Sequence, residues 1–462
     1  MIYLIALICF SLPSYLIRFS VFGIPTTALE LLIYIAAVAT LILKIKNQKQ
    51  KTQTKNEKIS ILDSKFLIPI GLFLLAGIIS AFVSPDKRAG LGLFKAYIFD
   101  PILFFVILIV NLDEKKKSEI LNSKIETSSK LKIQNSKQKL KIGNYLFRDR
   151  SRKRLEILLK SLILSGAIVA IHAIWQRITG QITPDGRVIG LFGYSPNYLA
   201  LYLAPITVLT IGYCLFRVKS RKLLIIRKNL TTLLLYIFIT LILFLALYFS
   251  GSRAGIGAVI IGLISFFILK YWFWIKSRKL VLLFLCFFIL LLLFGGWQLI
   301  KPNWQLKPEE GGRITSSNNI RWEIWKTTVK DIIPKDNNWL LGVGLGNYQN
   351  HFTELTKDRV NFPEWIAPRA LTPHNLFLTI WLNLGLLGLM AFIWLLTLFF
   401  LFAIRSIRYS RGSGVMLAAA MITIIAHGLI DTPYWKNDLA MMFWIFLALV
   451  YISVKIRKEG YV

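Results

Sequence analysis

Cysteine is scarce in this chain, with 3 residues among 462. Cys9, Cys214 and Cys286 all lie inside apolar runs, and no two of them have the spacing of a metal-binding pair. The sequence therefore gives no basis for a disulfide framework or for a thiolate zinc site. All three fit the role of small buried apolar side chains.

Acidic residues are also few, with 23 against 56 basic residues and a formal net charge of +33. In a soluble protein such an excess indicates nucleic-acid binding. Here the basic residues stand in short segments between apolar runs, which is the positive-inside pattern and also attracts anionic lipid. The Lys-rich stretches 46–60 and 113–142 contain no aromatic residues. We therefore expect solvated insertions there and no nucleic-acid partner.

Several catalytic motifs are missing. The sequence has no Walker A motif for ATP, no GxSxG nucleophile elbow and no HExxH zinc motif. No DxD pair stands at an outer membrane boundary, so nothing indicates a metal-dependent sugar-nucleotide enzyme. We expect neither a metal nor a cofactor.

Long apolar runs dominate what is present, since 55% of the residues are hydrophobic and the mean hydropathy is +0.60. A helix needs about 20 apolar residues to cross a bilayer, and these runs do not alternate as barrel strands would. The pattern predicts an all-α polytopic membrane protein of about twelve transmembrane helices. The expected spans are residues 2–17, 26–43, 66–84, 90–110, 156–175, 197–216, 231–250, 254–269, 280–300, 376–404, 414–431 and 438–454.

Two of these runs have special features. Residues 2–17 lack a basic leader and a small-residue cleavage site, so we expect a retained first span rather than a signal peptide. The run from Leu376 to Ala403 is too long for one straight span. We predict that it begins as a separate, partly embedded helix and breaks near Asn383–Gly385.

Basic residues set the expected orientation. With the N-terminus in the cytoplasm, the cytoplasmic segments hold 37 of the 56 Lys and Arg residues. We therefore expect a multi-pass protein of the cytoplasmic membrane with both termini inside. Residues 1–155 form an N-terminal part with the Lys-rich insertions, and residues 156–455 form a core. The core includes one large outer segment, 301–373, between the ninth and tenth spans.

The outer segment contains a predicted amphipathic helix in the stretch NNIRWEIWKTTVKDIIP. Asn318 or Asn319 is the expected N-cap, and Pro334 is the expected end. The apolar stripe, lying at helical spacing, consists of Ile320, Ile324, Trp325 and Ile332. Long ordered loops of this kind are usually lids or walls of a site.

Arg253 stands in a tight turn, YFSGSRAGIGA, between two apolar runs. An Arg at such a turn costs free energy unless it snorkels to water or meets an anion. Ser252 and the following N–H groups open a helix, which favours an anion, and the flanking glycines allow close approach. We favour anion binding over a snorkelling Arg that merely ends a span.

Three other polar residues have plainer explanations on physics alone. Asn197 follows Pro196 and is best explained as the cap of the next span. Arg187 would be an ordinary loop residue. Arg321, at the start of the loop helix, is equally well explained as an exposed charge paired with Glu323.

His374 opens the helix after the outer segment, in LTPHNLFLTIW. A neutral imidazole there suits a general base near pH 7, and the alternative is an interfacial His bonded to backbone. His427 and Asp431 lie one turn apart in AHGLIDTPYW. They suit a structural pair or a support for the site, because two ligands are too few for a metal.

Lys95 and Asp100 interrupt the fourth span. Charges within a membrane are candidates for function. Their spacing does not match one helical turn, so we do not expect them to pair directly.

Taken in order, four stretches resemble the O-antigen ligase and O-antigen polymerase family of membrane glycosyltransferases. They are GRVIGLFGYSPNYLALYLAP, SGSRAGIGAVIIGL, RWEIWKTTVKDIIPKDNNWLLGVGLGNYQNHF and PHNLFLTIWLNLGLLGL, and a fifth, HGLIDTPYWKNDLAMMFWIFLAL, resembles the family's closing segment. The resemblance covers roughly residues 155–455. It implies a GT-C-like helical fold and metal-independent, inverting transfer of a glycan from undecaprenyl diphosphate on the outer membrane face.

The resemblance also implies roles for single residues. Arg253 and Arg321 would bind the donor diphosphate with help from Arg187, and His374 would deprotonate the acceptor hydroxyl. Further candidates for substrate binding in the matching stretches are Asn197, Ser252 and Asn375.

The acceptor stays open among a glycan, a lipid and a protein, so ligase, polymerase and protein O-oligosaccharyltransferase are all compatible with the sequence. A second hypothesis is a transporter or flippase of lipid-linked glycans. Such a protein would need charges within its spans and paired broken helices, and the sequence shows few of the first and no convincing repeat.

Overall fold

The computed structural model describes residues 1–21, 23–49, 64–112, 136–193, 195–217, 226–271, 317–358, 370–410 and 412–458. Most of these residues are helical, and the described strands form one antiparallel hairpin, β1 (Arg18–Val21) with β2 (Ile24–Thr27). The helices are α1 (Ile2–Phe10), η1 (Leu12–Leu16), α2 (Ala28–Lys49), α3 (Ser64–Val83), α4 (Lys87–Phe94), η2 (Lys95–Phe99), α5 (Asp100–Leu112), α7 (Ser136–Ile178), η3 (Gly190–Phe192), α8 (Pro196–Arg217), α9 (Ile226–Phe249), α10 (Arg253–Tyr271), α12 (Ser317–Thr327), η5 (Thr328–Ile332), α13 (Asn338–Leu341), α14 (Tyr348–Thr356), α15 (Leu376–Ser410), α16 (Gly412–Gly428) and α17 (Asn437–Lys458).

Within the described residues, nine helical stretches are long and apolar enough to cross a membrane, and α16 is a shorter apolar helix. The protein is therefore an all-α polytopic membrane protein, as the sequence predicts. The expected span at 280–300 lies outside the described residues.

The first expected span, residues 2–17, differs from the prediction. The α-helix ends at Phe10, and the chain continues as the 3-10 turn η1 into the β1–β2 hairpin. Pro13 explains the break, because its ring removes an N–H donor and clashes with the preceding turn. The Ser11 hydroxyl donates back to the Leu7 carbonyl at 2.7 Å, which closes the end of α1.

The break predicted in the long C-terminal run is confirmed at Gly385, where φ is 68° and ψ is −175° inside α15. A side chain at Gly385 would lie 2.3 Å from the Leu340 carbonyl oxygen, so α13 packs directly against the break. The Asn383 side chain accepts the Gly346 N–H at 3.1 Å. Glycine permits both the left-handed φ and this close approach.

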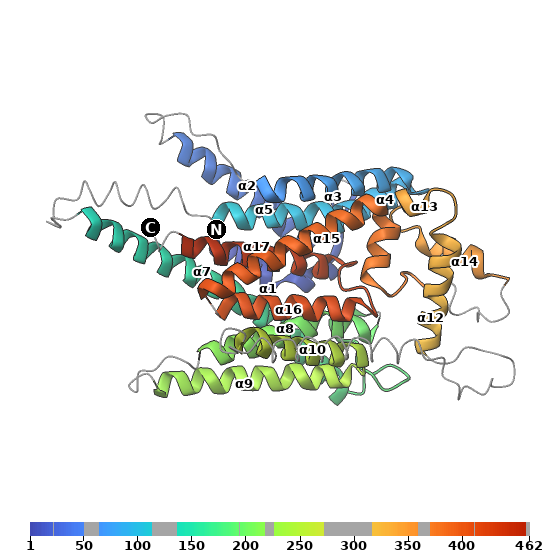
Figure 1. Cartoon of the computed structure of the whole chain (residues 1–462). Coiled ribbons are helices and arrows are strands. Elements are labelled where there is room, and N and C mark those ends of the chain that lie inside the picture. Colours follow the sequence, from blue (N-terminus) through green and yellow to red (C-terminus); the bar gives the residue numbers. More distant parts are fainter. Residues whose placement is uncertain are drawn as a thin grey trace, which may run out of the picture.

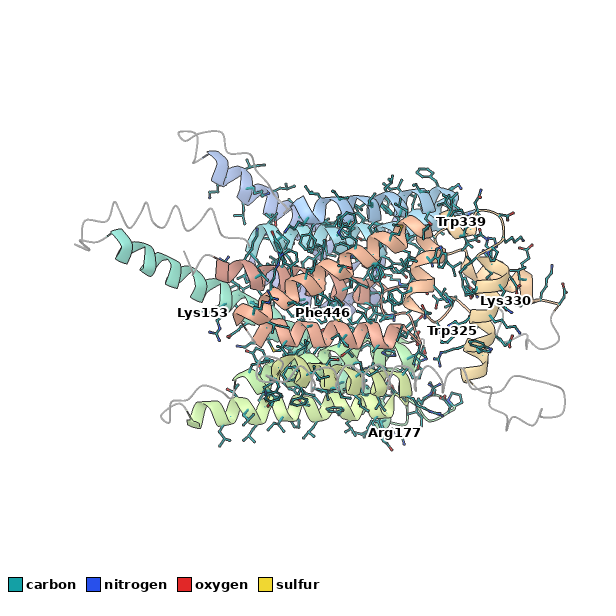
Figure 2. All side chains as sticks on the ribbon, viewed as in Figure 1. Lys153, Arg177, Trp325, Lys330, Trp339 and Phe446 are labelled. Atoms are coloured by element: carbon teal, nitrogen blue, oxygen red, sulfur yellow. The ribbon has the colours of Figure 1, made fainter. Side chains whose placement is uncertain are left out.

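The long helices lie side by side, and α12, α13 and α14 cover one end of the bundle, here called the loop end (Figure 1). Trp325, Lys330 and Trp339 lie at this end, and Lys153 lies towards the opposite one (Figure 2). The segment that contains α12, α13 and α14 has a small hydrophobic core of its own, which packs on Leu382 of α15. It is made of Ile324, Ile332, Ile333, Val343, Tyr348, Phe352 and Ala370.

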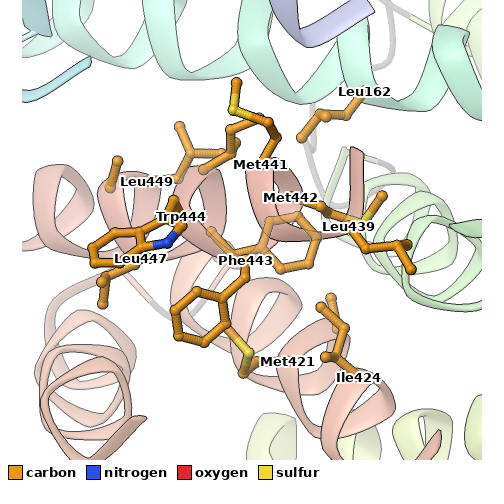
Figure 3. Packing of buried hydrophobic residues seen from close by; sticks show 14 of the residues in the cluster. Leu162, Met421, Ile424, Leu439, Met441, Met442, Phe443, Trp444, Leu447 and Leu449 are labelled. Atoms are coloured by element: carbon orange, nitrogen blue, oxygen red, sulfur yellow. The ribbon is translucent and has the colours of Figure 1, made fainter. Parts of the chain in front are cut away.

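Helix α17 lies in the centre of the bundle. Its side chains Met442, Phe443 and Trp444 pack near Met421 of α16 and Leu162 of α7 (Figure 3). These side chains are almost fully buried, and buried side chains in protein interiors are close-packed. The close packing of α17 therefore fixes the end of the turn that joins α16 to it.

Lys95 and Asp100 do not pair with each other; instead, each contacts α2. The Lys95 ammonium lies 2.8 Å from the Glu30 carboxylate, and the Tyr34 hydroxyl donates to Asp100 at 2.8 Å. Lys95 is the first residue of the π-helical turn η2, and Asp100 follows its last residue. Both charges thus hold the N-terminal helices together.

Candidate active site at the loop end

His374 and Asp431 meet at the loop end although they are far apart in the sequence. Nδ1 of His374 lies 3.4 Å from an Asp431 carboxylate oxygen. The His side chain is 33% exposed and the Asp side chain 7%. When Nδ1–H donates to the buried carboxylate, Nε2 is left as the acceptor of a ring that is one-third exposed.

The backbone at His374 is in the left-handed region, with φ of 49°, which is unusual for a residue with a side chain. The residue after it fixes the start of the helix that follows. The Asn375 side chain accepts the N–H groups of Phe377 and Leu378 at 3.0 and 3.1 Å, and donates to the Leu429 carbonyl at 3.0 Å. The structure thus uses Asn375 to cap α15 and tie it to the end of α16; its role in substrate binding stays a prediction.

The loop helix α12 reaches the same place. The Trp325 indole donates to the Pro373 carbonyl at 2.7 Å. Helix α12 begins at Ser317, so the caps predicted at Asn318 or Asn319 are wrong: both residues lie in its first turn. It ends through η5 before Pro334, as predicted.

Asp431 lies among basic groups. Burial acts to raise the pKa of its carboxyl, but the hydrogen bond from His374 and the charges of His374, His427 and Arg321 lower it to about 2. Within the described residues, Nε of Arg321 and both ring nitrogens of His427 are buried without a hydrogen-bond partner. The expected side-chain pair of His427 with Asp431 is thus replaced by the pair of His374 with Asp431.

The α9–α10 turn brings Arg253 to this end. Ser252 is buried and its hydroxyl accepts the Gly255 N–H at 3.2 Å, so it caps α10. A side chain at Gly255 would lie 3.4 Å from the His427 ring, which places the start of α10 against the end of α16. Arg253 is exposed, and no hydrogen bond or ion pair joins it to the other described residues.

Arg187 lies against the same turn. Its side-chain carbons occupy the space beside Gly251, 2.6 Å from where a β-carbon would be. Its guanidinium pairs with Asp185, at 2.6 Å from Nε and 2.5 Å from a terminal nitrogen. Arg187 and Arg253 are therefore neighbours through Gly251, and Asp185 is a partner that the sequence reasoning missed.

The cap predicted at Asn197 belongs instead to Ser195, whose hydroxyl accepts the Asn197 N–H at 3.2 Å. The physical reason is Pro196, which suits the first helical position and leaves the preceding residue as N-cap. Asn197 lies in the first turn of α8 and is half-buried.

The predicted residues thus form two adjoining groups. His374 and Arg321 gather around Asp431, while Arg187, Ser252 and Arg253 gather at the α9–α10 turn; the contact of Gly255 with His427 joins them. Across the described residues, no three His, Cys, Asp or Glu side chains stand close enough to hold a metal ion.

Residues 238–393 match the family model described as O-antigen ligase. The matched region contains Arg253, Arg321 and His374, while Arg187, Asp431 and the α17 core lie outside it. No curated protein matches the sequence significantly.

Proposed function

We propose that this chain, a member of the O-antigen ligase family through residues 238–393, moves a glycan from undecaprenyl diphosphate to an acceptor hydroxyl. The family indicates an O-antigen-ligase-type membrane enzyme acting on a lipid-linked glycan. The observation that carries the proposal is the His374–Asp431 pair, held beside Arg321 at the loop end. Such an arrangement would suit a base with its orienting carboxylate beside a cation for the leaving group.

His374 is the proposed general base. Nδ1–H donates to Asp431, so Nε2 takes the proton from the acceptor hydroxyl as its oxygen attacks the anomeric carbon of the donor. The bond from that carbon to the diphosphate breaks on the opposite face, which inverts the configuration. Asp431 then stabilises the imidazolium through the same hydrogen bond.

Arg187, Arg253 and Arg321 are the proposed partners of the donor diphosphate. The leaving diphosphate gains negative charge as the glycosidic bond breaks, and guanidinium groups stabilise it through charge-assisted hydrogen bonds. Ser252 supports this by capping α10, whose N-terminal N–H groups favour an anion. Arg253 and the buried Nε of Arg321 have no hydrogen-bonding partner in the described part of the chain, so both are available to a ligand.

The proposed orientation places the loop end outside the cytoplasmic membrane and both termini in the cytoplasm. Two observations support it. The Lys49 end of α2 and the Ser136 start of α7, which lead into the Lys-rich segments, lie at the end opposite α12–α14 (Figure 1). Basic residues concentrate in those segments, as in cytoplasmic loops of membrane proteins.

The test uses purified protein with a lipid-diphosphate glycan and an acceptor glycan, lipid or peptide. Free undecaprenyl diphosphate should be released, and His374→Ala should abolish the release. His351→Ala is the matched control, because His351 is half-buried in α14 outside the site. Unchanged turnover in His374→Ala would refute the catalytic assignment. Glycan movement across vesicles without any turnover would support a transporter instead.

A further inference from the structure

Lys436 is a buried cation at the loop end, in the turn between α16 and α17, and is only 8% exposed. Its ammonium lies over three aromatic rings: 3.9 Å from the centre of Tyr198, 4.5 Å from Phe192 and 5.4 Å from Tyr15. Its Nζ has no hydrogen-bond partner among the described residues. The faces of aromatic rings therefore surround this cation.

Such a placement is costly unless the rings compensate for lost water. A buried ammonium loses its hydration, and aromatic faces attract it most strongly when water is excluded. The Asp438 carboxylate gives further electrostatic support, although one of its oxygens and the Tyr15 hydroxyl are also buried without partners in the described chain. This concentration of unpaired polar atoms needs an explanation beyond packing.

The rings come from separate parts of the chain. Phe192 and Tyr198 belong to the stretch that begins at Arg187, here called the donor loop (the described residues 187–193 and 195–198). Lys436 belongs to the turn that carries Asp431, here called the base turn (residues 429–436).

Further contacts fix the base turn. The Lys436 N–H donates to the Tyr434 carbonyl at 2.7 Å, and the Tyr434 hydroxyl donates to the Tyr97 carbonyl at 2.9 Å. Asp431 and Asp438 both lie within electrostatic reach of the Tyr198 hydroxyl. Tyr198 is therefore near both the carboxylate of the proposed base pair and the buried cation.

We propose that Lys436 is a positioning residue that clamps the donor loop to the base turn, so that Arg187 of the donor loop and the His374–Asp431 pair keep their relative placement. This inference rests on the proposed function. Tyr15 makes the N-terminal segment the third wall of the clamp, which gives that segment a part in the site.

Because Lys436 must be protonated to attract the rings, the clamp should make the activity depend on pH. Burial lowers the pKa of Lys436 to about 8, with Asp438 acting to raise it and Arg18 to lower it. The groups that face it are Asp438 on α17, Arg18 on β1, Tyr15 on η1 and Tyr198 on α8. Above about pH 8 the ammonium loses its proton and the attraction to the rings, so activity should fall on the alkaline side.

The test compares Lys436→Met, which keeps the stem without the charge, with Lys436→Arg, which keeps a cation. We expect Lys436→Met to raise the KM for the lipid-diphosphate donor about tenfold. We also expect its pH–activity profile to lack the fall near pH 8, here called the alkaline limb, that the wild-type protein shows. Lys436→Arg should restore most of the affinity and move that limb to higher pH, because guanidinium stays charged. Lys270→Met is the matched control, since Lys270 lies 5.3–5.9 Å from four ring centres at the far end of α10.

Binding of the lipid diphosphate without acceptor separates this inference from the proposed function. Wild-type protein that binds no lipid diphosphate would refute the proposed function. If the wild-type protein binds the lipid diphosphate, and Lys436→Met binds it with the same affinity and shows the same fall in activity at alkaline pH, the clamp is refuted and the proposed function is not. This conclusion holds even where Lys436→Met unfolds at a lower temperature. That last pattern would make Lys436 a stabilising residue only.

Discussion

The core around α17 and the loop end differ in where their buried polar groups find partners. In the core helices, the hydroxyls of Thr207, Thr210 and Thr423 each donate to a carbonyl one turn back, at 2.7–2.9 Å. At the loop end, polar atoms of Arg321, His427 and Lys436 are buried without hydrogen bonds to the described residues. The three threonine hydroxyls are thus satisfied within their own helices, although Ser151 and His172 of α7 also hold buried atoms without a partner among the described residues. What sets the loop end apart is that its unpartnered donors lie beside the proposed site.

The largest expected effect is the loss of the Asp431 carboxylate. Asp431→Asn should lower kcat about 1,000-fold with little change in donor KM, because an amide no longer fixes the Nδ1–H tautomer or stabilises the imidazolium. Release of undecaprenyl diphosphate measures it. Asp336→Asn, an exposed position on the loop end, is the control. Equal losses in both variants would remove the distinction between Asp431 and an ordinary surface carboxylate.

A core substitution should show the opposite behaviour. Phe446 of α17 is fully buried, and Phe446→Ala leaves a cavity. We expect a loss of about 2 kcal/mol in the free energy of unfolding, below the usual range for soluble cores because lipid removes much of the transfer term. Thermal unfolding in detergent measures it, and kcat of the folded fraction should stay unchanged. A selective fall in kcat would show that the core shapes the site directly.

The contrast between the two regions also explains what the sequence could predict. Apolar runs and the break at Gly385 depend on residues near each other in the chain, so periodicity and a single glycine were enough. The pair of His374 with Asp431, and the rings around Lys436, join distant segments, and no local pattern indicates them. A single lysine between two apolar runs, such as Lys436, has no local feature that distinguishes it. The cap at Ser195 was predictable, because Pro196 marks the first helical position.

Acid should weaken the loop end before the core. The folded pKa of Asp431 is about 2 against an ordinary 3.8, so its carboxylate contributes stability fully above pH 3.8 and loses it as pH falls towards 2. The loss amounts to about 2 kcal/mol. Thermal unfolding between pH 5 and pH 2 should be flatter in Asp431→Asn than in wild type. Identical curves would mean that the carboxylate titrates as in an unfolded chain.

The smallest expected effect separates Arg321 from its neighbours on the same helix. Arg321→Met should raise the KM for the lipid-diphosphate donor about tenfold, or about 1.4 kcal/mol, because a charge-assisted contact is lost. Lys326→Met is the control, since Lys326 is half-exposed and pairs with Glu323 at 3.9 Å, a surface contact worth little. A large effect of Lys326→Met would mean that the whole face of α12 attracts the donor by charge. An effect confined to Arg321 would place the diphosphate next to its buried Nε, within reach of Asp431 and His374.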